Sequence, residues 1–166
     1  MKKIVLLLTL FVSAAQLANA QAYEGKGDQK LQISLNAQDG GTGISSSLDF
    51  GLGENMSLGV VATYLLNAND VNGQSARFQD RADLKARFNA NIGNVLGLSP
   101  KMDVYPGLHL GTRNFGGHLG FRYFFTTGFG LFTEAAVPFA RYDTDVIGRE
   151  NYNNQFTFNI GASFNL

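Results

Sequence analysis

The chain has 166 residues with 13 basic and 13 acidic side chains, and it contains neither cysteine nor tryptophan. A balanced charge offers no basic surface for nucleic acid, and the lack of cysteine excludes disulfides and a lipidated cysteine anchor. Glycine (20) and phenylalanine (14) are frequent, whereas proline (3) is scarce. After the first twenty residues no segment stays apolar for the roughly 18 residues that a membrane-spanning helix needs, although such averages overlook strands of alternating character.

The first twenty residues have the pattern of a secretory signal peptide. A basic start precedes an apolar run over 4–12, and a small-x-small tripeptide ends at Ala20. The apolar run is too short to cross a membrane, and its flanks fit export followed by cleavage. We therefore expect cleavage after Ala20 and a single mature domain over 21–166. Loss of two lysines with the signal leaves this domain slightly acidic.

Apolar and polar residues alternate through most of the remaining chain. A period of two predicts strands, because successive side chains of a strand point to opposite faces. Eight strands of about ten residues follow from this pattern, over 30–37, 43–52, 56–65, 81–90, 102–111, 115–125, 129–140 and 155–166. A tilted strand of this length is sufficient to cross a bilayer.

The turns between the predicted strands differ in length at the two ends of the sheet. The longest loops, 66–80 and 141–154, follow the third and seventh strands and therefore share one end, which we expect to face the cell exterior. Two of the three turns at the other end are short, and 91–101 is the exception. An even number of strands returns both termini to that second end.

The size of an eight-stranded barrel decides which face points outward. Its interior is just wide enough to be filled by side chains, so four or five large apolar residues per strand would overfill it. The apolar faces also place aromatic residues near the two rims, as Phe50, Phe88, Tyr123, Phe125, Phe129 and Phe164 at one and Tyr64, Phe115, Phe139 and Phe156 at the other. Two aromatic girdles are typical of membrane barrels. We predict an all-β, eight-stranded antiparallel transmembrane up-and-down β-barrel with outer-membrane lipid around it.

Three central segments resemble a known group of proteins. DVYPGLHLG at 103–111, GHLGFRYF at 117–124 and FGLFTE at 129–134 resemble hairpins of small eight-stranded outer-membrane barrels, the OmpX-like and OmpA-transmembrane-domain-like proteins, especially their Bacteroidetes-type versions. The resemblance covers essentially all of the mature chain and implies a porin-like fold in the outer membrane of a Gram-negative cell. It implies little about function, because the group includes structural, adhesive and uncharacterised proteins.

The C-terminal residues are expected to act in assembly. The group prefers a terminal phenylalanine, whereas this chain ends in Leu166 and keeps Phe164 two residues earlier. The resemblance therefore implies that Phe164 and Leu166 form the signal read by the barrel-assembly machinery, weakened at most by the terminal leucine.

Charged residues on the polar faces are predicted to lie inside the barrel. They number four of each sign and comprise Asp49, Arg81, Asp83, Lys85, Arg87, Asp103, Arg122 and Glu134. Buried charges persist only when paired and hydrogen-bonded, so a balanced set predicts a structural network that plugs the interior. Arg122 and Glu134 flank one short turn and are expected to lie close enough to pair. The alternative is a selective pore with an unpaired ring of one sign.

His109 and His118 also face inward on neighbouring predicted strands. A metal site would need a third ligand, and none is evident, so we predict two hydrogen-bonded histidines with no metal and no cofactor. An outer-membrane hydrolase would need a nucleophile, a base and an orienting group on the lipid side. Both histidines face away from that side, which predicts a protein without catalytic residues.

The expected role is therefore structural or surface-interactive, with an unidentified surface ligand contacting loops 66–80 and 141–154. Tyrosine and asparagine in the second loop suit adaptable contacts. A small pore or a ligand-binding barrel is the main alternative. A lipid-modifying enzyme and a soluble lipocalin-like binder are further alternatives, and the second lacks the Gly-x-Trp signature because the chain has no tryptophan.

Overall fold

The computed structural model describes residues 21–70, 75–142 and 151–166. Eight strands and a one-turn helix follow one another in the order β1 Gln29–Gln38, β2 Gly41–Gly53, β3 Met56–Ala68, α2 Phe78–Arg81, β4 Ala82–Ala90, β5 Met102–Gly111, β6 Asn114–Phe124, β7 Phe129–Arg141 and β8 Thr157–Asn165. Within these described ranges no helix combines the length and hydrophobicity that crossing a membrane requires. The predicted signal peptide lies outside the described residues.

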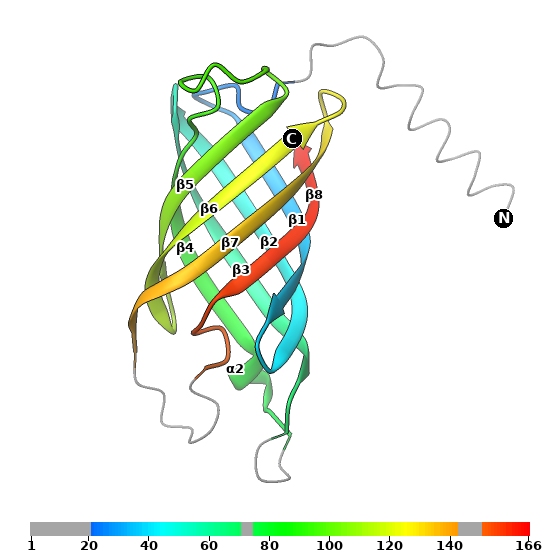
Figure 1. Ribbon diagram of the computed structural model, residues 1–166, viewed down its shortest axis with the longest axis vertical. Coiled ribbons are helices and arrows are strands. Elements are labelled where there is room, and N and C mark those ends of the chain that lie inside the picture. The colour runs from blue at the N-terminus through cyan, green and yellow to red at the C-terminus, as the bar shows by residue number, and fades with distance from the viewer. Residues whose placement is uncertain (1–20, 71–74, 143–150) are drawn as a thin grey trace, which may run out of the picture.

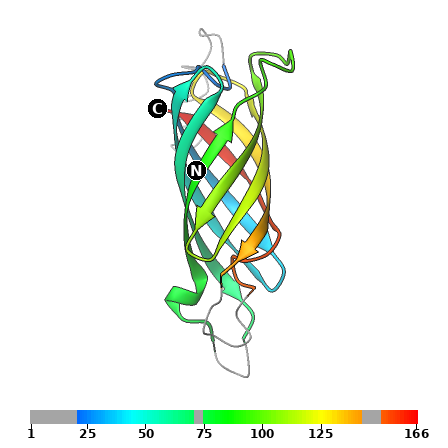
Figure 2. The ribbon, with the colours of Figure 1, turned by 90° about the vertical axis from the view of Figure 1, so that its left-hand side faces the viewer.

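The eight strands form one closed antiparallel barrel in which every strand pairs with its neighbours in sequence (Figure 1). The closing pair joins β8 to β1, with Phe164 opposite Leu31 and Ala162 opposite Ile33. The strands are tilted against the long axis of the barrel, as closure of an eight-stranded sheet demands (Figure 2). This architecture confirms the predicted fold class.

The two ends of the barrel differ in their connections (Figure 1). One end carries the segment 21–28, the C-terminus, the β2–β3 and β6–β7 turns and the longer connection 91–101; we call it the N-terminal mouth. The other end carries the β1–β2 and β5–β6 turns together with both long connections, and we call it the long-loop mouth. The predicted distribution of long and short connections is the one that the structure has.

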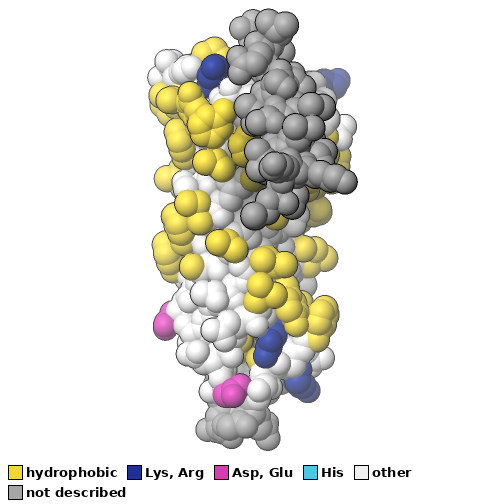
Figure 3. Space-filling view, turned by 90° about the vertical axis from the view of Figure 1, so that its right-hand side faces the viewer, with side chains coloured by type: hydrophobic (Ala, Val, Ile, Leu, Met, Phe, Trp, Pro, Cys, Tyr) yellow, Lys and Arg dark blue, Asp and Glu magenta, His cyan; other side chains and the backbone are white. Residues whose placement is uncertain are grey.

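The exterior wall of the barrel is apolar. Ile33, Val60 and Leu131 are each about half exposed, at 51%, 51% and 48%, whereas the residues on either side of them along the strands are less exposed. Hydrophobic side chains are spread along the part of the wall that is visible in Figure 3, whereas the coloured charged side chains lie toward the two ends. The alternation of the sequence therefore places its apolar face outside and its polar face inside.

Aromatic side chains gather at both rims of this wall. At the N-terminal mouth a row of rings crosses β6, β7 and β8, with centroid distances of 5.0 Å for Tyr123–Phe125, 6.2 Å for Phe125–Phe129 and 5.7 Å for Phe129–Phe164. At the long-loop mouth the rings form two separate pairs, Tyr64–Phe78 at 5.2 Å and Phe115–Phe139 at 6.1 Å. The two rims thus enclose a band that is mainly aliphatic.

Candidate functional site

The centre of the barrel is occupied by the guanidinium group of Arg87 on β4. Its Nε donates to Asp49 Oδ1 at 2.7 Å, Nη2 donates to the second oxygen of Asp49, and Nη1 donates to Glu134 Oε2 at 2.9 Å. Nη2 also donates to Gln32 Oε1 (2.8 Å) and Ser47 Oγ (2.9 Å). The side chains of Arg87 and Asp49 are each only 2% exposed. A single arginine therefore ties β1, β2 and β7 together across the interior.

A second buried arginine lies nearer the N-terminal mouth. Arg122 on β6 donates from Nη2 (2.7 Å) and Nε (3.1 Å) to Asp103 Oδ2 on β5, and it also donates to Asn91. The other oxygen of Asp103 accepts a hydrogen bond from the backbone of Gly93 at 2.9 Å. The Tyr105 ring lies 4.5 Å from the guanidinium carbon, a cation–π distance. This cluster fills the section of the barrel below the connection 91–101.

Residues 21–28 lie across the N-terminal mouth as a strap. The Tyr23 hydroxyl donates to the carbonyl of Met56 at 2.6 Å, with that of Gly53 3.0 Å away, and the Tyr23 ring lies 5.9 Å from the guanidinium carbon of Arg122. Burial is the main cause that raises the pKa of the Tyr23 hydroxyl. The group therefore stays protonated, and able to donate, at neutral pH.

The strap is also fixed by a buried ion pair and an apolar contact. Lys30 Nζ lies 2.5 Å and 2.6 Å from the two carboxylate oxygens of Asp28 and 5.3 Å from the centre of the Phe124 ring. Ala22 is fully buried and packs with Phe124, and its backbone N–H donates to Pro100 O at 2.7 Å. The strap thus covers the mouth and supplies one of the buried charges.

The long-loop mouth is covered by residues 151–154. Asn153 is 2% exposed, and its backbone N–H donates to Gln38 Oε1 at 2.8 Å. Its side chain donates to Arg81 O at 3.1 Å, while its carbonyl accepts from Asn114 Nδ2 at 2.7 Å. The segment is therefore bonded to β1, to α2 and to β6. In the part of the chain that the structure describes, both mouths are covered by the protein's own backbone.

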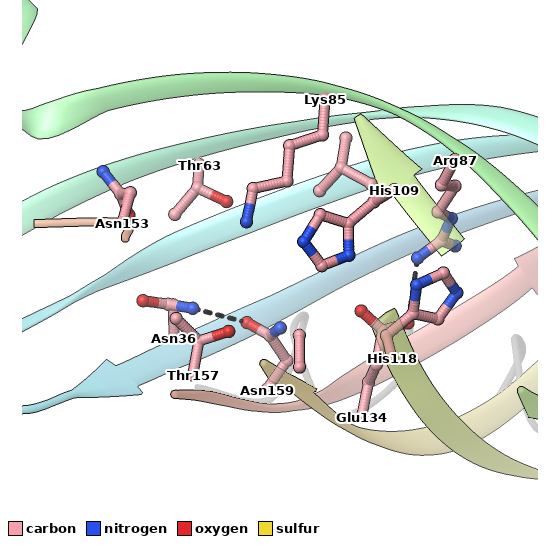
Figure 4. Close-up of a pocket in the computed structure, with 12 residues that line it drawn as sticks. Asn36, Thr63, Lys85, Arg87, His109, His118, Glu134, Asn153, Thr157 and Asn159 are labelled. Atoms are coloured by element: carbon pink, nitrogen blue, oxygen red, sulfur yellow. Dashed lines mark hydrogen bonds and ion pairs between the residues drawn. The ribbon is translucent and has the colours of Figure 1, made fainter. Parts of the chain in front are cut away.

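A small cavity lies between the Arg87 network and the long-loop mouth. The space within which the centre of a water molecule can move is about 20 Å³, so the cavity has room for one or two waters. Lys85 reaches into it from one wall, opposite Glu134 (Figure 4). Lys85 Nζ lies 3.4 Å from Asp83 on its own strand. The cavity is too small for an organic ligand.

The two histidines stack beside this cavity, with ring centroids 5.8 Å apart (Figure 4). His118 Nε2 lies 2.7 Å from Asn89 Oδ1, and His109 Nε2 lies 3.0 Å from Asn114 Oδ1. Among the described residues no three His, Cys, Asp or Glu side chains gather closely enough to hold a metal ion. Each imidazole is thus engaged with an amide of the barrel interior.

Glycines make room for the large inward side chains. Tyr105 pairs with Gly120 across β5 and β6, and a Cβ added at Gly120 would lie 2.0 Å from the tyrosine ring. His118 pairs in the same way with Gly107, where an added Cβ would lie 2.3 Å from the imidazole. Each of these two rings therefore packs over a glycine of the neighbouring strand.

Replacing Gly120 by alanine should destabilise the barrel by about 1–3 kcal/mol, because the new methyl group overlaps the Tyr105 ring in a packed interior. Gly128 is the matched control, since nothing lies within 4 Å of a Cβ added there. Urea titration of the purified protein, followed by the gel mobility of folded and unfolded forms, measures the difference. Equal midpoints for the two variants would contradict this packing.

Arg81 was predicted to face the interior, and this prediction is wrong. It is the last residue of α2 and is only half buried, and its guanidinium donates to Ala76 O at 3.0 Å and Leu66 O at 3.3 Å. The short helix interrupts the alternation, and β4 begins one residue later than expected. The other seven predicted interior charges lie inside the barrel, and five of them are less than 5% exposed as whole residues, namely Asp49, Asp83, Arg87, Asp103 and Arg122.

The expected pairing of Arg122 with Glu134 is also wrong. The register places Gly120 opposite Glu134, whereas Arg122 is opposite Asp103 on the preceding strand. Glu134 instead meets Arg87 across the interior. The sequence analysis missed the ion pair between Asp28 and Lys30. Lys30 lies two residues before Gln32 in β1, so the alternation alone could have placed its side chain inside the barrel.

The closed eight-stranded sheet, with an apolar exterior and a polar interior, defines a barrel of the type that transmembrane β-barrels have. The chain belongs to the DUF6646 family, a family of unknown function, which it matches over residues 12–166. A search of curated proteins finds no match.

Two solved structures are similar in fold. A barrel from de novo design of transmembrane β-barrels has a TM-score of 0.57 and 11% sequence identity, and the match covers 86% of this chain and 98% of the designed one. Outer membrane protein G from Pseudomonas aeruginosa, solved by solution NMR, has a TM-score of 0.49 and 10% identity, covering 87% and 99% of the two chains. At identities this low the comparison shows the fold alone, and this conclusion rests on the designed barrel.

Proposed function

We propose that this protein is an integral outer-membrane β-barrel, exported with a signal peptide that is cleaved after Ala20, and that its interior is a plug. The observation that carries the proposal is the inverted distribution of polarity. Arg87 and Asp49 are buried at the centre, while residues such as Val60 are half exposed on the wall. A contiguous apolar wall of this size is costly in water and favourable in lipid.

The dimensions of the wall support a membrane position. The strands have 9 to 13 residues, and about 9–11 tilted residues cross a bilayer. Aromatic rings border the aliphatic band at both ends, where a bilayer has its two interfaces. The resemblance to OmpX-like and OmpA-like barrels points to the same location, with the long-loop mouth outside the cell.

Cell fractionation tests the location. We expect the protein in the outer-membrane fraction, with a gel mobility in detergent that changes on heating, because a closed barrel stays folded in the detergent until it is heated. A protein recovered from the soluble periplasm with no such change in mobility would overturn the proposal.

The buried networks favour a plug over the alternative, a small pore. Arg87 is bonded to three strands in the centre of the barrel, and the strap and residues 151–154 cover the two mouths. We therefore expect no steady conductance from the purified protein in a planar bilayer. A steady conductance that disappears when Arg87 or Arg122 is replaced would show that these residues line a pore.

The role that fits a plugged barrel is structural or surface-interactive, without catalysis. The described parts of the two long loops are joined at the mouth, where Tyr152 packs with Leu65 and Ala68. This contact would hold the bases of the two loops together for a surface partner, after the barrel-assembly machinery has inserted the protein. Exchanging the tips of 66–80 and 141–154 for glycine-serine segments tests this role, and unchanged adhesion of the cells would argue against it.

A further inference from the structure

An arc of arginines runs along one side of the long-loop mouth, from α2 to the end of β7. Its members are Arg77, Arg81, Arg113 and Arg141. Arg113 links the two ends of the arc, because its Nη2 donates to Gln79 O in α2 at 2.6 Å and its carbonyl accepts from the backbone N–H of Tyr142 at 3.0 Å. The four guanidinium groups therefore belong to one continuous stretch of the rim.

The arginines of this arc keep hydrogen-bond donors available. The Arg77 side chain is 61% exposed and its contact with Asp80 is long, at 3.4 Å. Arg141 is exposed, and within the described residues its side chain makes a long hydrogen bond of 3.5 Å to Asn151. Arg113 donates through one of its nitrogens to a single backbone carbonyl. These groups can therefore bind an external anion without breaking a buried network.

Among the acidic residues described at this end, Asp80 alone forms a salt bridge with a member of the arc, at 3.4 Å from Arg77. Asp80 and Asp83 are buried. Asp39 and Asp70 are exposed and lie beside the β1–β2 turn, where the N–H of Asn69 donates to Gly40 O at 3.0 Å. The described N-terminal mouth differs, because its exposed charged side chains are Lys26, Lys101, Glu24 and Glu54 and include no arginine.

The arc lies at the height of the aromatic rim. Phe78 is 72% exposed and its ring packs at a tilt against Tyr64, next to Arg77 in the sequence. Phe115 and Phe139 lie one and two residues, respectively, from the paired Asn114 and Arg141 of β6 and β7. Exposed aromatic rings mark the level where the apolar part of a bilayer ends. Arginine side chains at this level are long enough to reach lipid headgroups.

We propose that the arginine arc binds the phosphate groups of glycolipid headgroups in the leaflet around the long-loop mouth. The inference rests on the proposed function, since it requires the barrel to span the outer membrane with this mouth outside. A guanidinium group binds phosphate through two parallel hydrogen bonds, which an ammonium group cannot do. An arc made only of arginine, with exposed aromatic rings beside it, suits a phosphate that is carried by a lipid.

The test uses the mature protein in phosphatidylcholine vesicles with or without lipid A. We expect lipid A to slow unfolding in urea several-fold, through attraction between arginine and phosphate near the membrane surface. Arg113→Gln combined with Arg141→Gln should lose most of this effect, whereas Lys26→Gln combined with Lys101→Gln at the other mouth should keep it. Arg113→Lys with Arg141→Lys retains the charges and should lose part of it, which provides a second variant if the glutamine form does not fold.

Two further arms identify the ligand chemistry. Lipid A without its phosphate groups, and free inorganic phosphate, should both leave the unfolding rate unchanged. The inference would be overturned if lipid A slowed unfolding equally in the unaltered protein, in Arg113→Gln with Arg141→Gln and in Lys26→Gln with Lys101→Gln. It would also be overturned if phosphate-free lipid A slowed unfolding of the unaltered protein as much as lipid A does. Failure of the unaltered protein to insert into vesicles would contradict the membrane location itself, which is a different result.

Discussion

Replacing Arg87 by methionine is expected to lower the free energy of unfolding by about 3–5 kcal/mol, the cost of breaking a buried ion pair on one side. The carboxylates of Asp49 and Glu134 would stay in the interior without their shared cation, and Gln32 and Ser47 would lose a donor. The loss is a large fraction of the stability of a small domain. We therefore expect either a barrel that unfolds at much lower urea concentration or a failure to fold.

Two comparisons separate this effect from a general sensitivity to substitution. Arg77→Met removes a long 3.4 Å contact between a largely exposed guanidinium and Asp80, which keeps its hydrogen bond from the backbone N–H of residue 77, and it should cost less than about 1 kcal/mol. A triple variant that combines Arg87→Met with Asp49→Asn and Glu134→Gln removes the two unpaired carboxylates, and it should recover much of the lost stability. Circular dichroism in urea follows all three variants, since the chain has no tryptophan for fluorescence. A triple variant no more stable than Arg87→Met would contradict the charge argument.

The strands and their faces could be predicted from the sequence because one physical signal sets both. In β8 an apolar residue occupies every second position from Phe158 to Phe164, and this period requires a strand with one apolar side. The narrow interior of an eight-stranded barrel then decides that the apolar side is outside. Residues on the polar side, such as Arg87 and Asp103, could therefore be assigned to the interior without knowledge of their partners.

The partners themselves could not be predicted, because they depend on the tilt and stagger of the closed sheet. Arg87 meets Glu134 from a strand that is not its neighbour, and alternation within each strand carries no information about such contacts. The prediction for Arg81 failed for a local reason, because the first residue of the predicted strand 81–90 is the last residue of α2. The strap 21–28 has no periodic pattern, so its position across the mouth depends on contacts such as that of Tyr23 with Met56.

The stability of the buried charges depends in part on the strap 21–28. Buried charges are stable when they are paired and hydrogen-bonded. Arg122 is fully buried near the N-terminal mouth, and its Nη1 has no hydrogen-bond partner among the described residues. Tyr23 covers its guanidinium from the mouth, and Tyr105 covers it from within the barrel. The strap is thus part of the conditions under which the interior charges remain paired, as well as a lead into β1.

Changing Phe164 or Leu166 to aspartate is expected to reduce the yield of assembled barrel several-fold. Phe164 lies in the closing strand, opposite Leu31 of β1 and Phe129 of β7, and the N–H of Leu166 donates to Gln29 O at 3.1 Å. Both side chains therefore lie where the last strand must dock for the barrel to close. We propose that the barrel-assembly machinery also reads this end.

The magnitude of the effect distinguishes assembly from simple exposure to lipid. An acidic residue near the membrane interface costs at most about 1 kcal/mol on the lipid face, which would lower the folded yield of a stable barrel only slightly. Phe125→Asp measures that cost, because Phe125 is 51% exposed on the same rim but lies in the β6–β7 turn. Heat-modifiable protein in the outer-membrane fraction gives the yield of each variant. Yields that fall equally for Phe125, Phe164 and Leu166 would assign the loss to the lipid face alone, whereas a larger fall for the two C-terminal variants identifies the closing strand as the assembly signal.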